Sequence, residues 1–208
     1  NVELSSPLAK NDVYQVNEDS TLLISDTGNG ILANDADPNG FDFTLENILL
    51  IQPQHGQLNL SMDGTFSYVP YSDFFGVDQF QYQIKNTANI ASTAFVTINV
   101  NKVSDIPIAL DDNYQINEDE TLIVDELMGL LGNDIDLDNE LLTASIVSSP
   151  ISGSINLAGN GSFSYLPSKN FNGVDSFTYQ ITNEGGLSTS ANVSIIISAV
   201  NDAPTAVT

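Results

Sequence analysis

Residues 76–84 of this 208-residue chain read GVDQFQYQI, so that Phe80, Tyr82 and Ile84 alternate with polar residues. The same arrangement returns at residues 173–181, which read GVDSFTYQI. Apolar side chains with a period of two are typical of a β-strand that buries one of its faces, and both stretches therefore predict half-buried strands. Valine and isoleucine alternate in the same way near the end of each copy, which predicts one more strand there.

The repetition extends over most of the chain. Three further pairs of segments match: 14–19 with 114–119, 34–37 with 133–136, and 64–70 with 161–167. A repeat of about 100 residues is a whole domain with a core of its own. We therefore expect two tandem domains, residues 1–105 with an incoming linker and residues 106–208 with an outgoing one. The sequence from Pro204 onward resembles the start of another copy, so we expect the chain to be a piece of a longer protein.

Short strands and frequent turns predict an all-β fold. An Asp-Gly pair at 63–64 separates the stretches 57–60 and 65–68, as expected for a β-hairpin. Turn residues recur about every 8–12 residues, as in β-sandwiches. The best helical candidate is 125–131, where Gly129 lowers the helix propensity and leaves one short turn at most. We therefore predict two tandem β-sandwiches.

The chain is strongly acidic. It holds 27 aspartates and glutamates against four lysines and no arginine, for a net charge of −23. Such a charge repels phosphate groups, which argues against nucleic-acid binding and against attachment to anionic membrane surfaces. It also opposes compaction unless it is neutralised, so we weigh two explanations, solubility and bound cations. Cysteine is absent and no stretch approaches the ~20 apolar residues of a membrane span, so we expect neither disulfides nor membrane insertion.

An acidic Asp-x-Asp pair stands at the same place in both copies. The two pairs are Asp35 with Asp37 and Asp134 with Asp136. Two carboxylates one residue apart on a turn can converge on one hard cation, and Ca²⁺ takes about six to eight oxygen ligands in flexible geometry. Turn formation alone also favours aspartate, but for these two pairs we favour a metal site.

The loop that begins at Asp35 also fits the EF-hand pattern in every position up to Glu46. No amphipathic helix flanks it, and the second copy has Asn139 at the glycine position, so we reject an EF-hand. At the next alternate position of the loop, Asn39 in the first copy and Asp138 in the second, we favour turn formation over metal binding.

Three more acidic positions are shared by the two copies. They are the end of the first strand, the residue after a Gly-Val pair, and the linker, occupied by Glu18 and Glu118, Asp78 and Asp175, and Asp105 and Asp202. Each alone could be a solvated or turn-capping acid. Because they recur together with the Asp-x-Asp pairs, we predict that all ten carboxylates bind metal, with Ca²⁺ as the cofactor.

Together these motifs resemble the cadherin repeat. Residues 30–37 and 171–179 are similar to the cadherin-like tandem repeats of very large bacterial surface adhesins, which are commonly exported by type I secretion. The resemblance covers nearly the whole chain, and it implies a seven-stranded Greek-key sandwich in each copy with Ca²⁺ at the junctions. The ligands that it implies at the junction within this chain are Glu18, Asp78, Asp105, Asp134 and Asp136. The first linker departs from the pattern, because Ser5 stands where the second linker has Asp105.

The resemblance implies a function as well. It implies a calcium-rigidified spacer of a secreted or cell-surface bacterial adhesin, active in cell adhesion and biofilms, with neighbouring repeats of the same chain as partners. Two alternatives stay open: an adhesive module that binds a cell-surface glycan or protein, and an accessory domain of a secreted enzyme. We expect no catalytic activity, because His55 is the only histidine and no tryptophan is present to line a sugar cleft.

Overall fold

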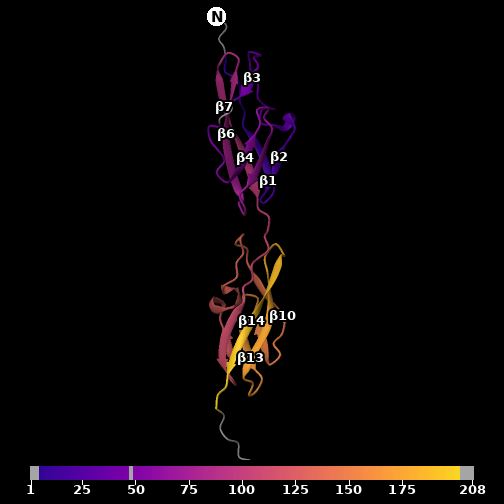
Figure 1. Ribbon diagram of the computed structural model, residues 1–208, viewed down its shortest axis with the longest axis vertical. Helices are drawn as coiled ribbons and strands as arrows, with labels where there is room; N and C mark the ends of the chain where they lie inside the picture. Colours follow the sequence, from indigo (N-terminus) through magenta and orange to yellow (C-terminus); the bar gives the residue numbers. More distant parts are fainter. Residues whose placement is uncertain (1–4, 47–48, 202–208) are drawn as a thin grey trace, which may run out of the picture. The chain divides into compact units, whose positions relative to one another are not determined.

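The computed structural model describes residues 5–46 and 49–201, which fold as two compact units, Asn1–Val103 and Ser104–Thr208 (Figure 1). Within the described residues each unit has seven β-strands and no α-helix, which confirms the all-β prediction. The strands of unit 1 are β1 (Asp12–Asn17), β2 (Leu22–Ile24), β3 (Phe43–Leu45), β4 (Gly56–Leu60), β5 (Phe66–Pro70), β6 (Gly76–Asn86) and β7 (Ala91–Asn101). Those of unit 2 are β8 (Asp112–Asn117), β9 (Leu122–Val124), β10 (Thr143–Ser148), β11 (Gly153–Leu157), β12 (Phe163–Pro167), β13 (Gly173–Thr182) and β14 (Ser188–Ser198).

Each unit is built from two sheets. In unit 1 a four-stranded sheet has the order β1-β7-β6-β3, and a three-stranded sheet has the order β2-β5-β4. Unit 2 repeats both sheets, with the orders β10-β13-β14-β8 and β11-β12-β9. The first and last strands of each unit, β1 with β7 and β8 with β14, pair in parallel, whereas the other strand pairs are antiparallel. Because the first and last strands run in the same direction, the chain enters each unit at one end and leaves it at the opposite end.

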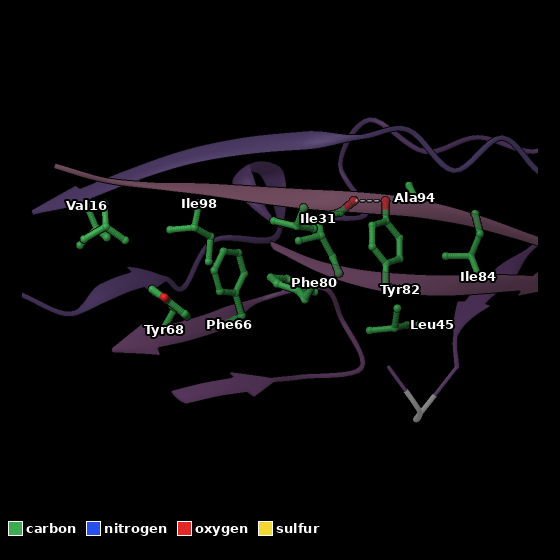
Figure 2. Packing of buried hydrophobic residues seen from close by; sticks show 12 residues of the cluster. Val16, Ile31, Leu45, Phe66, Tyr68, Phe80, Tyr82, Ile84, Ala94 and Ile98 are labelled. Atoms are coloured by element: carbon green, nitrogen blue, oxygen red, sulfur yellow. Dashed lines mark hydrogen bonds between the residues drawn. The ribbon is translucent and has the colours of Figure 1, made fainter. Parts of the chain in front are cut away.

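The core of unit 1 is formed by the alternating residues of its longest strands (Figure 2). Phe80, Tyr82 and Ile84 on β6 are fully buried, as their period of two predicts. Phe66, which comes from the other sheet, meets Phe80 edge to face with 6.0 Å between ring centroids. The Tyr82 hydroxyl donates a hydrogen bond to the Ile31 carbonyl oxygen at 3.0 Å, so the polar end of this buried ring is satisfied. The corresponding residues build the core of unit 2.

The predicted hairpin is present in both units. In unit 1, β4 pairs antiparallel with β5 through a turn in which Gly64 has a φ of +84°, a left-handed conformation that glycine adopts without strain. Gly161 takes a φ of +82° in the same turn of unit 2. Gly56, at the start of β4, lies against Tyr68, and an added Cβ would come within 2.5 Å of the ring. Glycine at these positions therefore fixes the hairpin against the core.

Short 3-10 helices lead into the Asp-x-Asp loops. The turn predicted at 125–131 is found as η2 (Glu126–Met128) and η3 (Leu130–Gly132), and unit 1 has η1 (Thr27–Asn29) in the corresponding place. Asp125 caps η2, because one of its carboxylate oxygens accepts a hydrogen bond from the Met128 amide nitrogen at 3.1 Å. Across the described parts of the chain, no helix has the length and apolar character needed to cross a membrane.

Candidate metal centre

At the N-terminal end of unit 2, acidic side chains gather around the first residues of the unit. Asp138 is 7 % exposed, and its Oδ2 accepts a hydrogen bond from the Asp105 amide nitrogen at 2.7 Å. Glu140 Oε2 accepts one from the Ser104 hydroxyl, also at 2.7 Å. Asp136 Oδ1 accepts hydrogen bonds from the amide nitrogens of Asp138 and Glu140, both at 3.0 Å. We call the following residues the front cluster of unit 2: Ser104, Asp105, Asp136, Asp138, Glu140 and Asn183.

Asn183, which follows β13, connects the members of this cluster. Its side-chain nitrogen donates to the Asp105 carbonyl oxygen at 2.8 Å and to Asp136 Oδ2 at 3.2 Å. The donors available to a cation here are therefore carboxylate, carbonyl and hydroxyl oxygens. An all-oxygen set with several carboxylates suits a hard cation, so the residues present fit Ca²⁺.

Unit 1 has the same backbone arrangement with fewer charges. Asp37 accepts hydrogen bonds from the Asn86 side chain and from the Asn39 amide nitrogen, each at 2.7 Å. The bond from Asn86 is the main cause that lowers the pKa of Asp37 below its ordinary value. The Asn39 side chain in turn donates to the Ser5 carbonyl oxygen at 2.8 Å. The residues that correspond to the three further acids of unit 2 are uncharged: Asn39 for Asp138, Phe41 for Glu140 and Ser5 for Asp105.

The first aspartate of each Asp-x-Asp pair has other partners than the second. Asp134 accepts hydrogen bonds from the Tyr179 hydroxyl at 3.1 Å and from the Leu110 amide nitrogen at 2.8 Å, and burial raises its pKa. Asp136 instead bonds to Asn183, four residues beyond Tyr179 in the chain. The two carboxylates therefore reach different points along the same sheet, and the pair in unit 1 is arranged in the same way.

A further aspartate, not singled out in the sequence, lies beside each of these pairs. Asp12 accepts a hydrogen bond from the Asn34 side chain at 2.8 Å, while its Oδ2 is buried and has no hydrogen-bond partner in the described structure. Burial, followed by the charge of Asp35, raises the pKa of Asp12 to about 6. Asp112 in unit 2 has the same buried oxygen, and burial raises its pKa to about 6 as well. The signal in the sequence was an aspartate two residues before a tyrosine in both copies.

Glu18 and Glu118 lie where the chain leaves their units. Glu18 is 2 % exposed, and its Oε1 accepts a hydrogen bond from the Val103 amide nitrogen at 2.6 Å. Glu118 makes the same bond to the Val200 amide nitrogen at 2.7 Å. Each glutamate thus reaches from the end of the first strand to the segment that follows the last strand, and it holds the chain where it leaves the unit.

Two more acids, Asp19 and Asp73, meet at this end of unit 1, and neither was among the predicted site residues. Both have left-handed backbones, with φ of +55° and +58°, and the Asp73 amide nitrogen donates to Asp19 Oδ1 at 3.5 Å. Asp119 and Asn170 repeat the contact in unit 2 at 3.2 Å. The available signal was the Glu-Asp doublet, because its second acid recurs as faithfully as its first.

Asp78 is an internal hydrogen-bond acceptor. It is 3 % exposed, and its Oδ2 accepts a hydrogen bond from the Tyr68 hydroxyl at 2.8 Å. Three more donors are backbone amides, at 2.9 Å each: Gln54, His55 and Gln79. Burial alone would raise the pKa of Asp78, but these four hydrogen bonds lower it below its ordinary value. Asp175 accepts the corresponding bond from Tyr165 at 2.8 Å.

The structure does not bring Asp78 to Glu18, although both were expected in one ligand set. Asp78 stands opposite Ile98 on β7, and Ile98 stands opposite Tyr14 on β1. Tyr14 precedes Glu18 by four residues, which along a strand is about 13 Å. The carboxylate of Asp78 instead ties the segment before β4 to β6, and Asp175 does the same in unit 2.

Of the predicted ligands, the structure gathers Asp105 and Asp136 in one cluster and adds Asp138 and Glu140. Asp138, interpreted from the sequence as a turn former, is buried and accepts a hydrogen bond from the Asp105 backbone. Asp202 lies outside the described residues.

Comparisons with known proteins agree with the geometry. The sequence profile of the bacterial cadherin-like domain matches residues 5–102 and again residues 104–199. No curated protein matches the chain by sequence. The crystal structure of human mucin-like protocadherin EC1-2 is similar, with a TM-score of 0.60 and 12 % identity over 93 % of this chain and 98 % of that one. Human CDH23 EC21-23 is similar with a TM-score of 0.59 and 13 % identity over 95 % and 70 %. At these identities the likeness concerns the fold alone, which is that of tandem cadherin repeats.

Proposed function

The chain belongs to the bacterial cadherin-like domain family, and from this premise we propose that it is a calcium-binding spacer of a secreted or cell-surface bacterial adhesin. The observation that carries the proposal is the front cluster of unit 2, whose carboxylates accept hydrogen bonds from the Ser104 hydroxyl and the Asp105 amide nitrogen. In this role the module works outside the cell, in adhesion and biofilm formation, and its partners are neighbouring repeats of the same chain.

The proposed ligands differ from the ten predicted residues. Asp134 keeps accepting capacity beyond its bonds from Tyr179 and Leu110, because an ionised carboxylate has about four lone-pair sites, and it stays in the set. Asp78 and Asp175 are left out, because donors of the protein occupy their oxygens. The proposed set is Glu18, Asp105, Asp134, Asp136, Asp138 and Glu140, with weaker sites at Asp35, Asp37, Glu118 and Asp202.

The linker between the units is held at consecutive residues. Val103 donates its amide hydrogen to Glu18, and the next two residues bond to carboxylates of the front cluster of unit 2. Like charges repel, so these carboxylates oppose their own gathering when no cation is near. Bound Ca²⁺ supplies the positive charge that lets the carboxylates stay close. Once the carboxylates are fixed, the linker backbone that donates to them loses freedom, and the linker becomes stiff.

Thermal unfolding in chelator and in about 5–10 mM Ca²⁺ tests this proposal, since extracellular modules bind Ca²⁺ at about 10⁻⁴–10⁻³ M. A ligand bound only by the folded state adds about 2.7 kcal/mol at a hundredfold excess over its Kd. We therefore expect a clear rise in Tm with Ca²⁺ and a smaller one with Mg²⁺, which prefers rigid octahedral sites. An unchanged Tm in Ca²⁺ contradicts the proposal.

The proposed role requires no catalysis. The single histidine, His55, stacks on Phe74 with 4.2 Å between ring centroids, and its amide nitrogen donates to the buried Asp78. Both contacts belong to the packing of unit 1, so we assign His55 a structural role. We therefore propose a non-enzymatic module.

A further inference from the structure

Unit 2 contains an open cavity of about 600 Å³, mostly apolar, between its 3-10 helices and the segment that leads into β10. Four leucines supply its apolar walls: Leu127, Leu131, Leu141 and Leu142. Leu131 and Leu142 pack against the core and form the floor. Leu127 and Leu141 stand at the rim and are 86 % and 72 % exposed. A cavity of this size holds a small ligand or a side chain of a partner.

The leucines at the rim are not needed for the fold, because unit 1 builds the same backbone without them. The two units align here through one hydrogen bond, from Ile31 to the Gly64 carbonyl oxygen in unit 1 and from Leu130 to that of Gly161 in unit 2. On this alignment the place of Leu127 is taken in unit 1 by Gly28. The place of Leu141 is taken by Asp42.

Two glycines line the cavity and add no side-chain volume to it. Gly132 and Gly159 both line it, and the corresponding residues of unit 1 are Ala33 and Met62. Neither glycine has a φ in the left-handed region, so backbone conformation does not explain them. Unit 2 therefore has a cavity at a place where unit 1 carries bulkier side chains, and it surrounds that cavity with leucine. Exposed apolar residues grouped around a concavity mark an interaction site more often than scattered ones do.

The charge around the cavity restricts the partner. Glu126 is part of the lining and accepts a hydrogen bond from the Asn160 side chain at 3.0 Å, and Asp125 precedes it. Residues 104–208 contain a single lysine, Lys169, and no arginine. A partner with negative charge would be repelled here, and a second copy of this chain has a net charge of −23.

We propose that this cavity is a docking site for an aliphatic side chain carried by a positively charged peptide segment of another protein. The aliphatic group enters between Leu127 and Leu141 and rests on the leucines of the floor. The positive charges of the segment face Glu126 and Asp125. This activity goes beyond the spacer role and does not depend on it, since none of these residues belongs to the proposed Ca²⁺ ligands.

Titration of the full chain with a short synthetic peptide of alternating lysine and leucine, followed by amide NMR shifts in Ca²⁺, tests the proposal. We expect the shifts to concentrate at Leu127, Leu131 and Leu141. A matched peptide with serine in place of leucine measures general charge attraction and should leave these amides unmoved. A third peptide, with glutamate in place of lysine, tests the charge and should not bind.

Two variants separate the cavity from the rest of the surface. Gly159→Met fills the cavity with the residue that unit 1 carries, and should weaken binding of the lysine–leucine peptide by about tenfold or more. Leu127→Gly with Leu141→Asn removes exposed side chains, so it leaves the core intact and should weaken binding to a similar extent. The same spectra report whether each variant is folded.

Several outcomes would overturn the proposal. Equal binding by the parent and by Leu127→Gly with Leu141→Asn would place the peptide elsewhere. Equal binding of the glutamate–leucine peptide would show that charge has no part. If the parent self-associates and Leu127→Gly with Leu141→Asn abolishes this, the cavity binds a second copy of the chain instead of a foreign peptide.

Discussion

Ser5 in unit 1 and Asp105 in unit 2 lie beside the same hydrogen-bonded frame. Asp37 with Asn86 forms it in unit 1, and Asp136 with Asn183 forms it in unit 2. Around this frame unit 2 carries three more acids, where unit 1 has serine, asparagine and phenylalanine. Unit 1 shows that the frame folds without these acids, so their presence in unit 2 needs another explanation, and cation binding supplies one.

The two units also differ in charge beside the first aspartate of the Asp-x-Asp pair. Burial raises the pKa of Asp35, and the amide and the positive charge of Lys10 oppose that rise. The counterpart of Lys10 in unit 2 is Leu110, which supplies the same amide hydrogen bond without a charge. Unit 1 therefore neutralises part of its front end with its own lysine, whereas unit 2 has no lysine at this position.

The largest expected effect concerns a place where the two units do not differ. Asp78→Ala and Asp175→Ala each strand a buried tyrosine hydroxyl and backbone amides, so each should cost the affected unit about 3 kcal/mol or more. The loss should be similar in both units and the same with Ca²⁺ or with chelator. Hydrogen exchange read by mass spectrometry resolves the two units. If Ca²⁺ reverses the loss of stability, Asp78 belongs in the proposed ligand set after all.

The next effect separates the front cluster of unit 2 from the corresponding residues of unit 1. Asp136→Asn with Asp138→Asn removes two charges and keeps one acceptor oxygen on each side chain. It should abolish most of the Ca²⁺ stabilisation, about 2.7 kcal/mol at a hundredfold excess over Kd. The matched variant Asp37→Asn should leave most of it. Titration calorimetry on the parent and both variants measures this. If Asp37→Asn removes the tighter Ca²⁺ binding and the double variant keeps it, the stronger site belongs to unit 1 and not to unit 2.

A graft tests the same difference by gain of function. Ser5→Asp, Asn39→Asp and Phe41→Glu give unit 1 the acids of unit 2, and should add a Ca²⁺-dependent stabilisation of about 1.4 kcal/mol when Ca²⁺ exceeds the new Kd about tenfold. Without Ca²⁺ the added charges should lower stability instead. The stability of unit 1 by hydrogen exchange is the readout. A graft that is indifferent to Ca²⁺ would mean that these three acids do not make the site.

The smallest effect is again common to both units and depends on pH. The pKa of Asp12 and of Asp112 is raised to about 6, so the folded state favours their protonated forms. The stability that this adds is lost as pH rises through about 6 and is fully present below the unfolded pKa of about 4. In chelator, stability should therefore increase from about pH 7.5 to about pH 5, by about 1 kcal/mol or less per site because water screens partly exposed groups.

Substitution of both residues tests that pH dependence. The double variant Asp12→Asn with Asp112→Asn should flatten the dependence between about pH 5 and about pH 7.5. Urea unfolding in chelator at several pH values provides the measurement. The expectation is wrong if the double variant keeps the full dependence of the parent.

The strands and the core were predictable because they depend on local alternation. Phe80, Tyr82 and Ile84 are buried as their spacing predicts, and the turn around Gly64 follows from its sequence alone. The role of Asp78 was not predictable, because two of its donors lie in a segment 23 and 24 residues earlier in the chain. Nothing in the pattern distinguishes an acid that accepts internal hydrogen bonds from one that faces a cation.

The front cluster was predictable in part. The Asp-x-Asp pair drew attention to Asp136, but Asp138 looked like a turn residue because aspartate is common in turns. What sets it apart is its contact with the backbone of Asp105, 33 residues earlier, which only the fold creates. The two copies differ here, with Asn39 in the first and Asp138 in the second, and because both residue types are common in turns, the pattern alone does not separate the two roles.

The parallel pairing of the first and last strands has a mechanical consequence. Residues Asp12 to Asn17 on β1 lie in register with Val96 to Asn101 on β7, and β8 with β14 repeats the arrangement. When the two ends of a unit are pulled apart, these strands must slide past one another along their length. All hydrogen bonds of the pair then carry the load together, instead of opening one after another as in unzipping. Each unit should therefore resist tension best along the line of its own chain ends.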